Sequence, residues 1–150
     1  MSFTEQDFEN AIIELMRDEL GYGYIYGPNV VRDYRSPLHE EMLLASLRDI
    51  NPRLSLEAIN EAIYKLKNYD SINLLQKNRV FMDYLQNGVE VGALYKGEMK
   101  YDRVRLIDYD HPEANHFYVI NQWTVVENAE KRPDVVVFIN GLPLVVMELK

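Results

Sequence analysis

Apolar positions recur at helical spacing through the first half of the chain. Between Phe8 and Met16 they return every three or four residues, which predicts an amphipathic helix with one buried stripe. Thr4 followed by Asp7 forms a capping-box pattern at its start, and Gly21 marks its end. Three further helices are expected: one from near Pro37 to Ile50, one from a Ser55 cap, and one from an Asp70 or Ser71 cap to Asn87.

Strand-like apolar runs follow in the second half. The expected strands are Val89–Leu94, Tyr101–Ile107, Phe117–Val126, and a hairpin made of Val135–Ile139 and Leu142–Met147. The Asn140-Gly141 dipeptide between the last two runs is a strong turn signal. A stretch rich in glycine and tyrosine after Gly21 indicates a loop with room for a short edge strand. Helices ahead of a mostly buried sheet predict the α/β class, with 1–150 as one domain.

Charged residues gather at the open end of this hairpin. Asp134 precedes the first strand, and Glu148 and Lys150 follow the second, two positions apart and therefore on one face. Mg²⁺ prefers carboxylate and carbonyl oxygens, so Asp134, Glu148 and the carbonyl of Leu149 are the predicted metal ligands. A metal-bound water is activated for attack on phosphorus, and Lys150 would orient that water or stabilise phosphate oxygens. The same pattern also fits buried strands whose charged ends simply reach solvent.

The register of the hairpin decides whether these carboxylates can meet. A regular two-residue loop at Asn140-Gly141 would set Asp134 opposite Met147, so Asp134 and Glu148 would face opposite sides of the sheet. A shared metal site therefore requires a three-residue connection with Gly141 at positive φ, or a β-bulge in one strand. Pro143 favours such an irregularity because it has no N–H to donate beside the turn.

Glu9 is a further candidate, on the first helix. Placing residues about 100° apart around the axis puts Glu9 inside the apolar arc and Glu14 on the polar side. A carboxylate on a core-facing stripe is costly unless it is paired or binds a metal. We therefore predict that Glu9 adjoins the Asp134 site, with Glu5 as the alternative one turn earlier. The competing interpretation is that Glu9 sits at the edge of the stripe and reaches water.

Composition and charge narrow the class of protein. The absence of cysteine excludes disulfides and Cys-based zinc sites. The N-terminus lacks the features of a signal peptide, and no apolar run approaches the ~20 residues of a membrane span, so a cytoplasmic protein without membrane contact is expected. The net charge of −8 is unfavourable for DNA binding, because Lys and Arg contacts to phosphate dominate affinity. Alone, the domain is expected to bind DNA weakly.

Four short sequence motifs together resemble those of a known protein family. They are Leu20-Gly-Tyr22, Leu106-Ile-Asp-Tyr109, Asn121-Gln-Trp-Thr-Val125 and, most specifically, the block from Arg132-Pro-Asp134 to Glu148-Leu-Lys150. From about Phe3 to its last residue the chain resembles the N-terminal PD-(D/E)xK nuclease domain of the restriction (R) subunit of type I restriction–modification enzymes. The resemblance implies a restriction-endonuclease-like core, with a central mixed sheet flanked by helices and a helical insertion.

The resemblance also implies an activity and its partners. It implies a type I site-specific deoxyribonuclease that cuts double-stranded DNA with Mg²⁺, in a complex with methylation and specificity subunits. Asp134, Glu148 and Lys150 match the motif, and Glu9 matches a helix glutamate of many relatives. The chain has no phosphate loop, so ATP binding is expected only in the motor domains of a parent protein. We expect 1–150 to be a fragment that ends at the catalytic Lys150 and is itself inactive.

Two other functions fit the same residues. The first is a stand-alone PD-(D/E)xK nuclease for repair or defence, without a motor. The second is a catalytically silent docking module that keeps the fold for contacts between subunits. A phosphate loop downstream in the parent gene would identify the motor-linked enzyme, and Mg²⁺-dependent nicking that is lost on Asp134→Ala would exclude the docking module.

Overall fold

The chain divides into two compact units. The computed structural model describes residues 2, 4–68, 74–126 and 129–149. The first unit, here called the sheet unit, contains Met1–Glu40 and His116–Lys150, and the second, the inserted unit, is Glu41–Asn115. The predicted insertion is therefore present, because the inserted unit interrupts the sheet unit along the sequence. The assignment of the whole chain to one domain stays a prediction.

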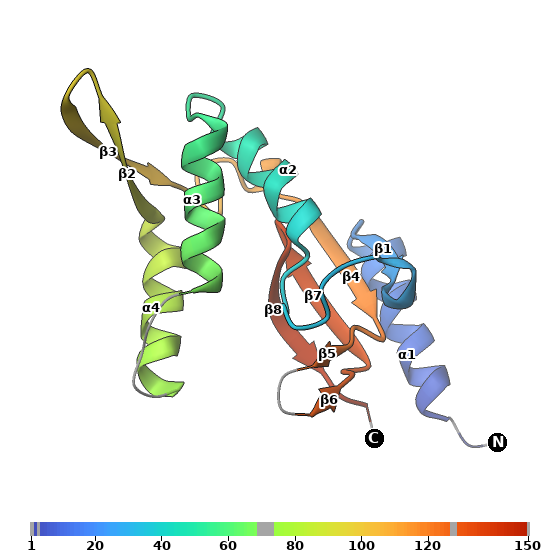
Figure 1. Cartoon of the computed structure of the whole chain (residues 1–150). Helices are drawn as coiled ribbons and strands as arrows, with labels where there is room; N and C mark the ends of the chain where they lie inside the picture. Colours follow the sequence, from blue (N-terminus) through green and yellow to red (C-terminus); the bar gives the residue numbers. More distant parts are fainter. Residues whose placement is uncertain (1, 3, 69–73, 127–128, 150) are drawn as a thin grey trace. The chain divides into compact units, whose positions relative to one another are not determined.

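A four-stranded sheet forms the centre of the sheet unit (Figure 1). In spatial order its strands are β1 (Gly23–Tyr26), β4 (Phe117–Asn121), β7 (Val135–Ile139) and β8 (Leu142–Met147). The β1–β4 pair is parallel and the other two pairs are antiparallel, so the sheet is mixed. Two short strands, β5 (Val125–Val126) and β6 (Glu130–Lys131), pair separately in the same unit. The α/β class and the mixed sheet are thus confirmed.

One helical segment covers one face of this sheet (Figure 1). It consists of α1 (Glu5–Glu14) followed by the π-helical turn η1 (Leu15–Glu19). The predicted capping box is formed, since Thr4 and Asp7 bond each other's backbone N–H groups. Ile13 of α1 lies in a buried cluster with Val119 and Val135 of the central strands. The helix is therefore fixed to the sheet by the stripe that its sequence predicted.

The opposite face of the sheet is covered by the chain that follows β1. Its core is a second cluster, made of Ile120, Trp123, Val136 and Phe138. The guanidinium carbon of Arg32 lies 3.5 Å from the centroid of the Trp123 ring, a cation–π contact, and burial lowers the pKa of Arg32. His39 stacks on the same indole ring with centroids 5.7 Å apart. Both faces of β4 and β7 are therefore buried.

The β7–β8 hairpin carries the irregularity that a shared metal site would need. Asn140-Gly141 forms a two-residue loop in which both residues have positive φ. Further from the loop the register shifts between Val137 and Phe138, so that Leu144 becomes an extra residue in β8. Pro143 lies beside this bulge, where its missing N–H costs little. The bulge alternative of the prediction is confirmed, and the three-residue connection is not formed.

The inserted unit contains three helices and a second hairpin. These are α2 (Glu40–Ile50), α3 (Leu56–Lys67), α4 (Leu74–Asn87), β2 (Val89–Tyr95) and β3 (Glu98–Val104). As predicted, Ser55 caps α3 by accepting the Ala58 N–H. The helix packs against both strands and buries its apolar stripe, which consists of Ala58, Ile59, Ala62 and Leu66. The two strands pair without a register shift around a Lys96-Gly97 turn.

Two polar side chains, Asn51 and Asp108, hold the segment that follows β3 in place by hydrogen bonds. The buried Asn51 amide exchanges two hydrogen bonds of 2.9 Å with the backbone N–H and carbonyl of Arg105. Asp108 then accepts the backbone N–H groups of Asp110 and His111 and the Arg105 guanidinium. The His111 N–H and the Arg105 contact hold the pKa of Asp108 below its ordinary value. Asp108 is therefore a structural carboxylate that closes a turn.

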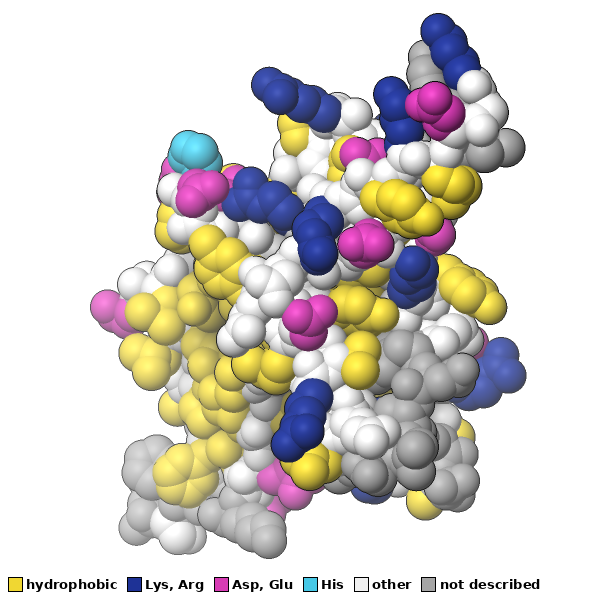
Figure 2. All heavy atoms as spheres, turned by 90° about the vertical axis from the view of Figure 1, so that its left-hand side faces the viewer, with side chains coloured by type: hydrophobic (Ala, Val, Ile, Leu, Met, Phe, Trp, Pro, Cys, Tyr) yellow, Lys and Arg dark blue, Asp and Glu magenta, His cyan; other side chains and the backbone are white. Residues whose placement is uncertain are grey.

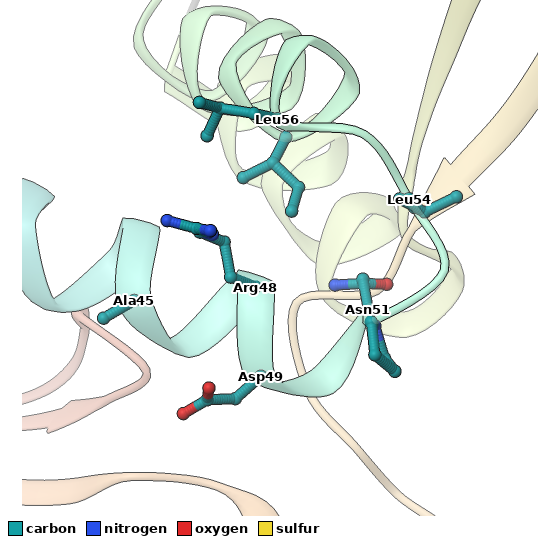
Figure 3. A pocket seen from close by; sticks show the side chains of 8 residues that line it. Ala45, Arg48, Asp49, Asn51, Leu54 and Leu56 are labelled. Atoms are coloured by element: carbon teal, nitrogen blue, oxygen red, sulfur yellow. The ribbon is translucent and has the colours of Figure 1, made fainter.

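A hollow of about 470 Å³ lies where α2 leads into α3 (Figure 3). Its lining is Ala45, Arg48, Asp49, Asn51, Pro52, Leu54, Leu56 and Ile59. Arg48 and Asp49 project from α2 in different directions (Figure 3). With one carboxylate in its lining, this hollow does not match the paired carboxylates of the predicted site.

Several expected boundaries are wrong. The helix expected from near Pro37 begins at Glu40, because the Pro37 carbonyl accepts the Trp123 indole N–H at 3.0 Å while this stretch covers the sheet. The strand expected over 117–126 stops at Asn121, because Gln122 adopts a φ of 53°.

Two further expectations concern the inserted unit and membranes. The strand expected over 101–107 lies at 98–104, because its register follows the Lys96-Gly97 turn. The proposed Asp70 or Ser71 cap lies outside the described residues. In the part of the chain that the structure describes, no helix is long and apolar enough to cross a membrane.

Candidate functional site

The bulge brings the first two predicted site residues into register. Val135 of β7 pairs with Met147 of β8, and this register continued by one position sets Asp134 opposite Glu148. The Asp134 carboxylate is half-buried and accepts the Leu149 backbone N–H at 2.7 Å through Oδ2. Glu148 is exposed to solvent. The open end of the hairpin therefore holds one anchored and one accessible carboxylate across a pair of strands.

Glu9 lies in the interior, as its helical position predicted. Only 4% of its surface is exposed, whereas Glu5 and Glu14 are exposed. Its Oε2 accepts the Gln6 amide at 3.1 Å, and its Oε1 accepts the Gln122 amide at 2.5 Å. The interpretation in which Glu9 reaches water from the edge of the stripe is therefore wrong, and Glu5 is not the buried carboxylate.

Glu9 approaches the hairpin end from a different face than the paired carboxylates. Val135 and Met147 belong to the cluster against α1. Strand alternation therefore directs Asp134 and Glu148, one position further out, to the other face. Gln122 lies between the two groups, because its side chain bonds Glu9 and its backbone N–H bonds the Asp134 carbonyl at 3.1 Å. Gln122 therefore links the Glu9 carboxylate to the Asp134 main chain, and a site shared by Glu9 and the pair stays a prediction.

Sequence reasoning did not assign a role to Asn121 and Gln122. Asn121 is buried at the end of β4, where its amide donates to Glu9 Oε2 at 3.4 Å and its Oδ1 accepts the Tyr24 hydroxyl at 3.0 Å. The available signal was two adjacent amide residues at the end of an apolar strand, which is an unusual place for buried polar groups. Their contact with Glu9 spans most of the chain, so no local pattern identifies it.

The chemistry of the donor set fits a hard divalent cation. Carboxylate and carbonyl oxygens are what Mg²⁺ prefers, and Asp134, Glu148 and Leu149 offer those groups at one hairpin end. Among the described residues, no three Asp, Glu or His side chains are grouped closely enough to hold a metal. The predicted ligand set has only two carboxylates and one backbone carbonyl, so it does not depend on a cluster of three such side chains. Lys150, the predicted partner of that set, lies outside the described residues.

Comparison with known proteins identifies the family of the chain. The family model described as the N terminus of the type I restriction enzyme R protein matches residues 2–150. The chain belongs to this family. The match includes α1, both amide residues and the whole hairpin, so every predicted site residue of this R-protein domain lies inside it.

Named relatives of this R-protein domain agree with the match. The chain is 32% identical to the type I restriction enzyme HindI endonuclease subunit of Haemophilus influenzae, over 98% of its own length. It is 33% identical to the putative type I restriction enzyme MjaIXP endonuclease subunit of Methanocaldococcus jannaschii, over 95% of its length. The aligned parts are 15% and 14% of those two relatives, so the chain spans about one seventh of their length.

Charge is distributed unevenly between the two units. The sheet unit carries 12 Asp and Glu against 6 Lys and Arg, a net charge of −6, and the inserted unit carries 12 against 10, a net charge of −2. Among the described residues on the face in Figure 2, Lys and Arg side chains are scattered between Asp, Glu and hydrophobic side chains and form no continuous basic patch. Excess negative charge favours a cation and repels a phosphate backbone.

Proposed function

We propose that this chain is the Mg²⁺-dependent nuclease domain of a type I restriction R subunit, and that it cuts double-stranded DNA. The observation that carries this proposal is the β-bulge at Leu144. A regular two-residue hairpin would place Met147 opposite Asp134, whereas the bulge shifts the pairing by one residue, so that Glu148 lies opposite Asp134. A bulge in a hairpin re-aims the side chains at one end of the strands, and such features are frequent beside active sites. Family membership supports the same conclusion.

The proposed roles follow from the chemistry of each group. Asp134, Glu148 and the Leu149 carbonyl would hold the cation, whose contribution is to lower the pKa of a bound water and to neutralise charge on phosphate. The Leu149 N–H bond anchors Asp134, so this carboxylate needs little reordering when a cation arrives. Lys150 is proposed to orient the attacking water or to stabilise phosphate oxygens. Glu9 is proposed to add negative charge from the α1 side of the sheet, where Gln122 links it to the Asp134 main chain.

Delivery of the duplex is proposed to depend on other parts of the complex. Because both units carry net negative charge, the domain alone lacks the cationic surface that holds DNA. We propose that an ATP-driven motor and the methylation and specificity subunits, acting together in the cytoplasm, supply those contacts. A restriction-endonuclease-like core is the fold that we propose for the sheet unit.

The test is cleavage of plasmid DNA by the assembled restriction complex that carries this domain. Mg²⁺-dependent cleavage should be present, and Asp134→Ala should lower it by at least about 10³-fold, because removing a metal ligand removes both water activation and charge neutralisation. Asp108→Ala is the matched control, since it removes a carboxylate that closes a turn in the inserted unit. The isolated 150-residue chain should show little cleavage. Full activity of the Asp134→Ala complex would favour the docking-module alternative and contradict the proposal.

A further inference from the structure

One residue joins α1 to the start of β7. The Gln122 side-chain amide donates to Glu9 Oε1, and its backbone N–H donates to the Asp134 carbonyl. The residue is half-buried and directly follows β4. Glu9 and Asp134, two predicted site residues that are distant in the sequence, are thereby both hydrogen-bonded to one residue.

The backbone of Gln122 is strained in order to make both bonds. Its φ of 53° lies in the left-handed region, which L residues other than Asn and Asp rarely adopt. Glycine would adopt this conformation without strain, but it has no amide to offer Glu9. Strain of this kind persists where the surrounding structure requires it, and it clusters at functional sites. The side-chain bond to Glu9 gives a physical reason for a glutamine at this position.

The neighbouring Asn121 fixes Glu9 from a second side. The Tyr24 hydroxyl donates to Asn121 Oδ1, which orients the amide so that its nitrogen faces Glu9 Oε2. With Gln6, three neutral amides therefore donate to one buried carboxylate. Among the described residues, no Lys or Arg forms an ion pair with Glu9. Neutral donors fix the orientation of the carboxylate and leave its negative charge available to a cation.

We propose that Gln122 is a positioning residue of the cation site: it links the Glu9 carboxylate to the Asp134 main chain and so raises the affinity for a divalent cation. This inference rests on the proposed function, because it assumes that the hairpin end binds a metal. Partners that orient a metal site from outside the ligand shell typically change metal affinity by about 10- to 100-fold. Gln122 is expected to act within that range.

Two substitutions separate positioning from simple support of the fold. Gln122→Gly removes the amide and relieves the backbone strain, whereas Gln122→Met removes the amide and keeps the strain. Calorimetric titration of the 150-residue chain with Mn²⁺ should give a dissociation constant about tenfold higher in both variants. Their thermal unfolding midpoints should differ, with the glycine variant the more stable. Lys96→Gly is the matched control, because Lys96 has a φ of 50° in the inserted unit and its replacement should leave Mn²⁺ affinity unchanged.

The outcomes distinguish this inference from the proposed function. Equal losses of affinity in both variants, regardless of their unfolding midpoints, support the positioning role. Wild-type affinity in either variant, with binding abolished by Asp134→Asn, overturns the positioning role and leaves the cation site standing. An affinity that follows the unfolding midpoint across the variants also overturns it. If the wild-type chain binds no Mn²⁺, the cation site and the positioning role are both overturned.

Discussion

The two hairpins of this protein begin alike and end differently. Each turns through two residues with positive φ, Lys96-Gly97 between β2 and β3 and Asn140-Gly141 between β7 and β8. The β2–β3 strands then pair without interruption, while the β7–β8 strands shift register at Leu144. Turn geometry therefore fixes the near end of a hairpin only. The far end, where the predicted catalytic residues lie, is set by the bulge.

Two aspartates, one in each unit, differ in how their charge is compensated. Asp108 of the inserted unit accepts backbone N–H groups and the Arg105 guanidinium, so its charge is compensated inside a turn. Asp134 of the sheet unit is anchored by the Leu149 N–H through one oxygen and lies across from an exposed carboxylate. A carboxylate with a cationic partner stabilises the fold, and one beside another carboxylate favours a metal.

Moving Glu148 by one position along β8 should have the largest effect. Insertion of one alanine between Val146 and Met147 would set Met147 opposite Asp134 and turn Glu148 to the other face. We expect Mn²⁺ affinity to fall at least about 100-fold, because the shared ligand pair is separated. Deletion of Leu144 is the matched control: it removes the bulge but leaves Val137 paired with Val145, so Asp134 stays opposite Glu148 and the affinity should be kept. Retained affinity in the insertion variant would refute the register argument.

The two turns should respond differently to alanine. Asn140 is fully buried, and it exchanges hydrogen bonds of 2.8 Å with the His116 backbone. Asn140→Ala should cost about 2–3 kcal/mol, because it leaves a buried N–H without its partner in a left-handed position. Gly97→Ala should cost about 1–2 kcal/mol, since an added Cβ meets no atom within 4 Å and only the backbone is strained. Chemical denaturation measures both values, and equal costs would contradict this account of the buried turn.

Acid should affect the inserted unit through Asp108. Because its pKa is lowered in the folded state, its stabilising contribution is present above the unfolded pKa and is lost as pH falls through the folded value. Asp108→Asn should therefore lower the thermal unfolding midpoint at pH 7 by a few degrees and flatten its dependence on pH between about 5 and 2. Asp134→Asn provides the comparison, with a smaller effect on the midpoint at pH 7. Unchanged pH dependence in Asp108→Asn would show that other carboxylates dominate.

Much of the fold could be predicted from local pattern. The period of apolar residues predicted α1 and the burial of Glu9, and the Asn140-Gly141 pair predicted the turn. The bulge followed from combining Pro143 with the chemistry that Asp134 and Glu148 would need. These features could be predicted because each depends on residues close in sequence or on a single chemical requirement.

The rest depends on contacts between distant segments. The early end of β4 and the role of Gln122 arise from its bonds to Glu9 and to the Asp134 carbonyl, which no periodicity encodes. The late start of α2 arises because the Pro37 carbonyl accepts the Trp123 indole N–H where this segment covers the sheet. The division into two units likewise reflects how 41–115 packs within itself, and the sequence has no linker to mark it.

Nuclear magnetic resonance can locate the cation on the protein directly. Substoichiometric Mn²⁺ broadens the amide signals nearest to its binding site. We predict selective broadening at Asp134, Val135 and Met147–Leu149, with the signals of the regular β2–β3 hairpin unaffected, and loss of the effect in Asp134→Asn. Broadening that is spread over the acidic surface, or that is centred on Asp108, would contradict a cation site at this end of the β7–β8 hairpin.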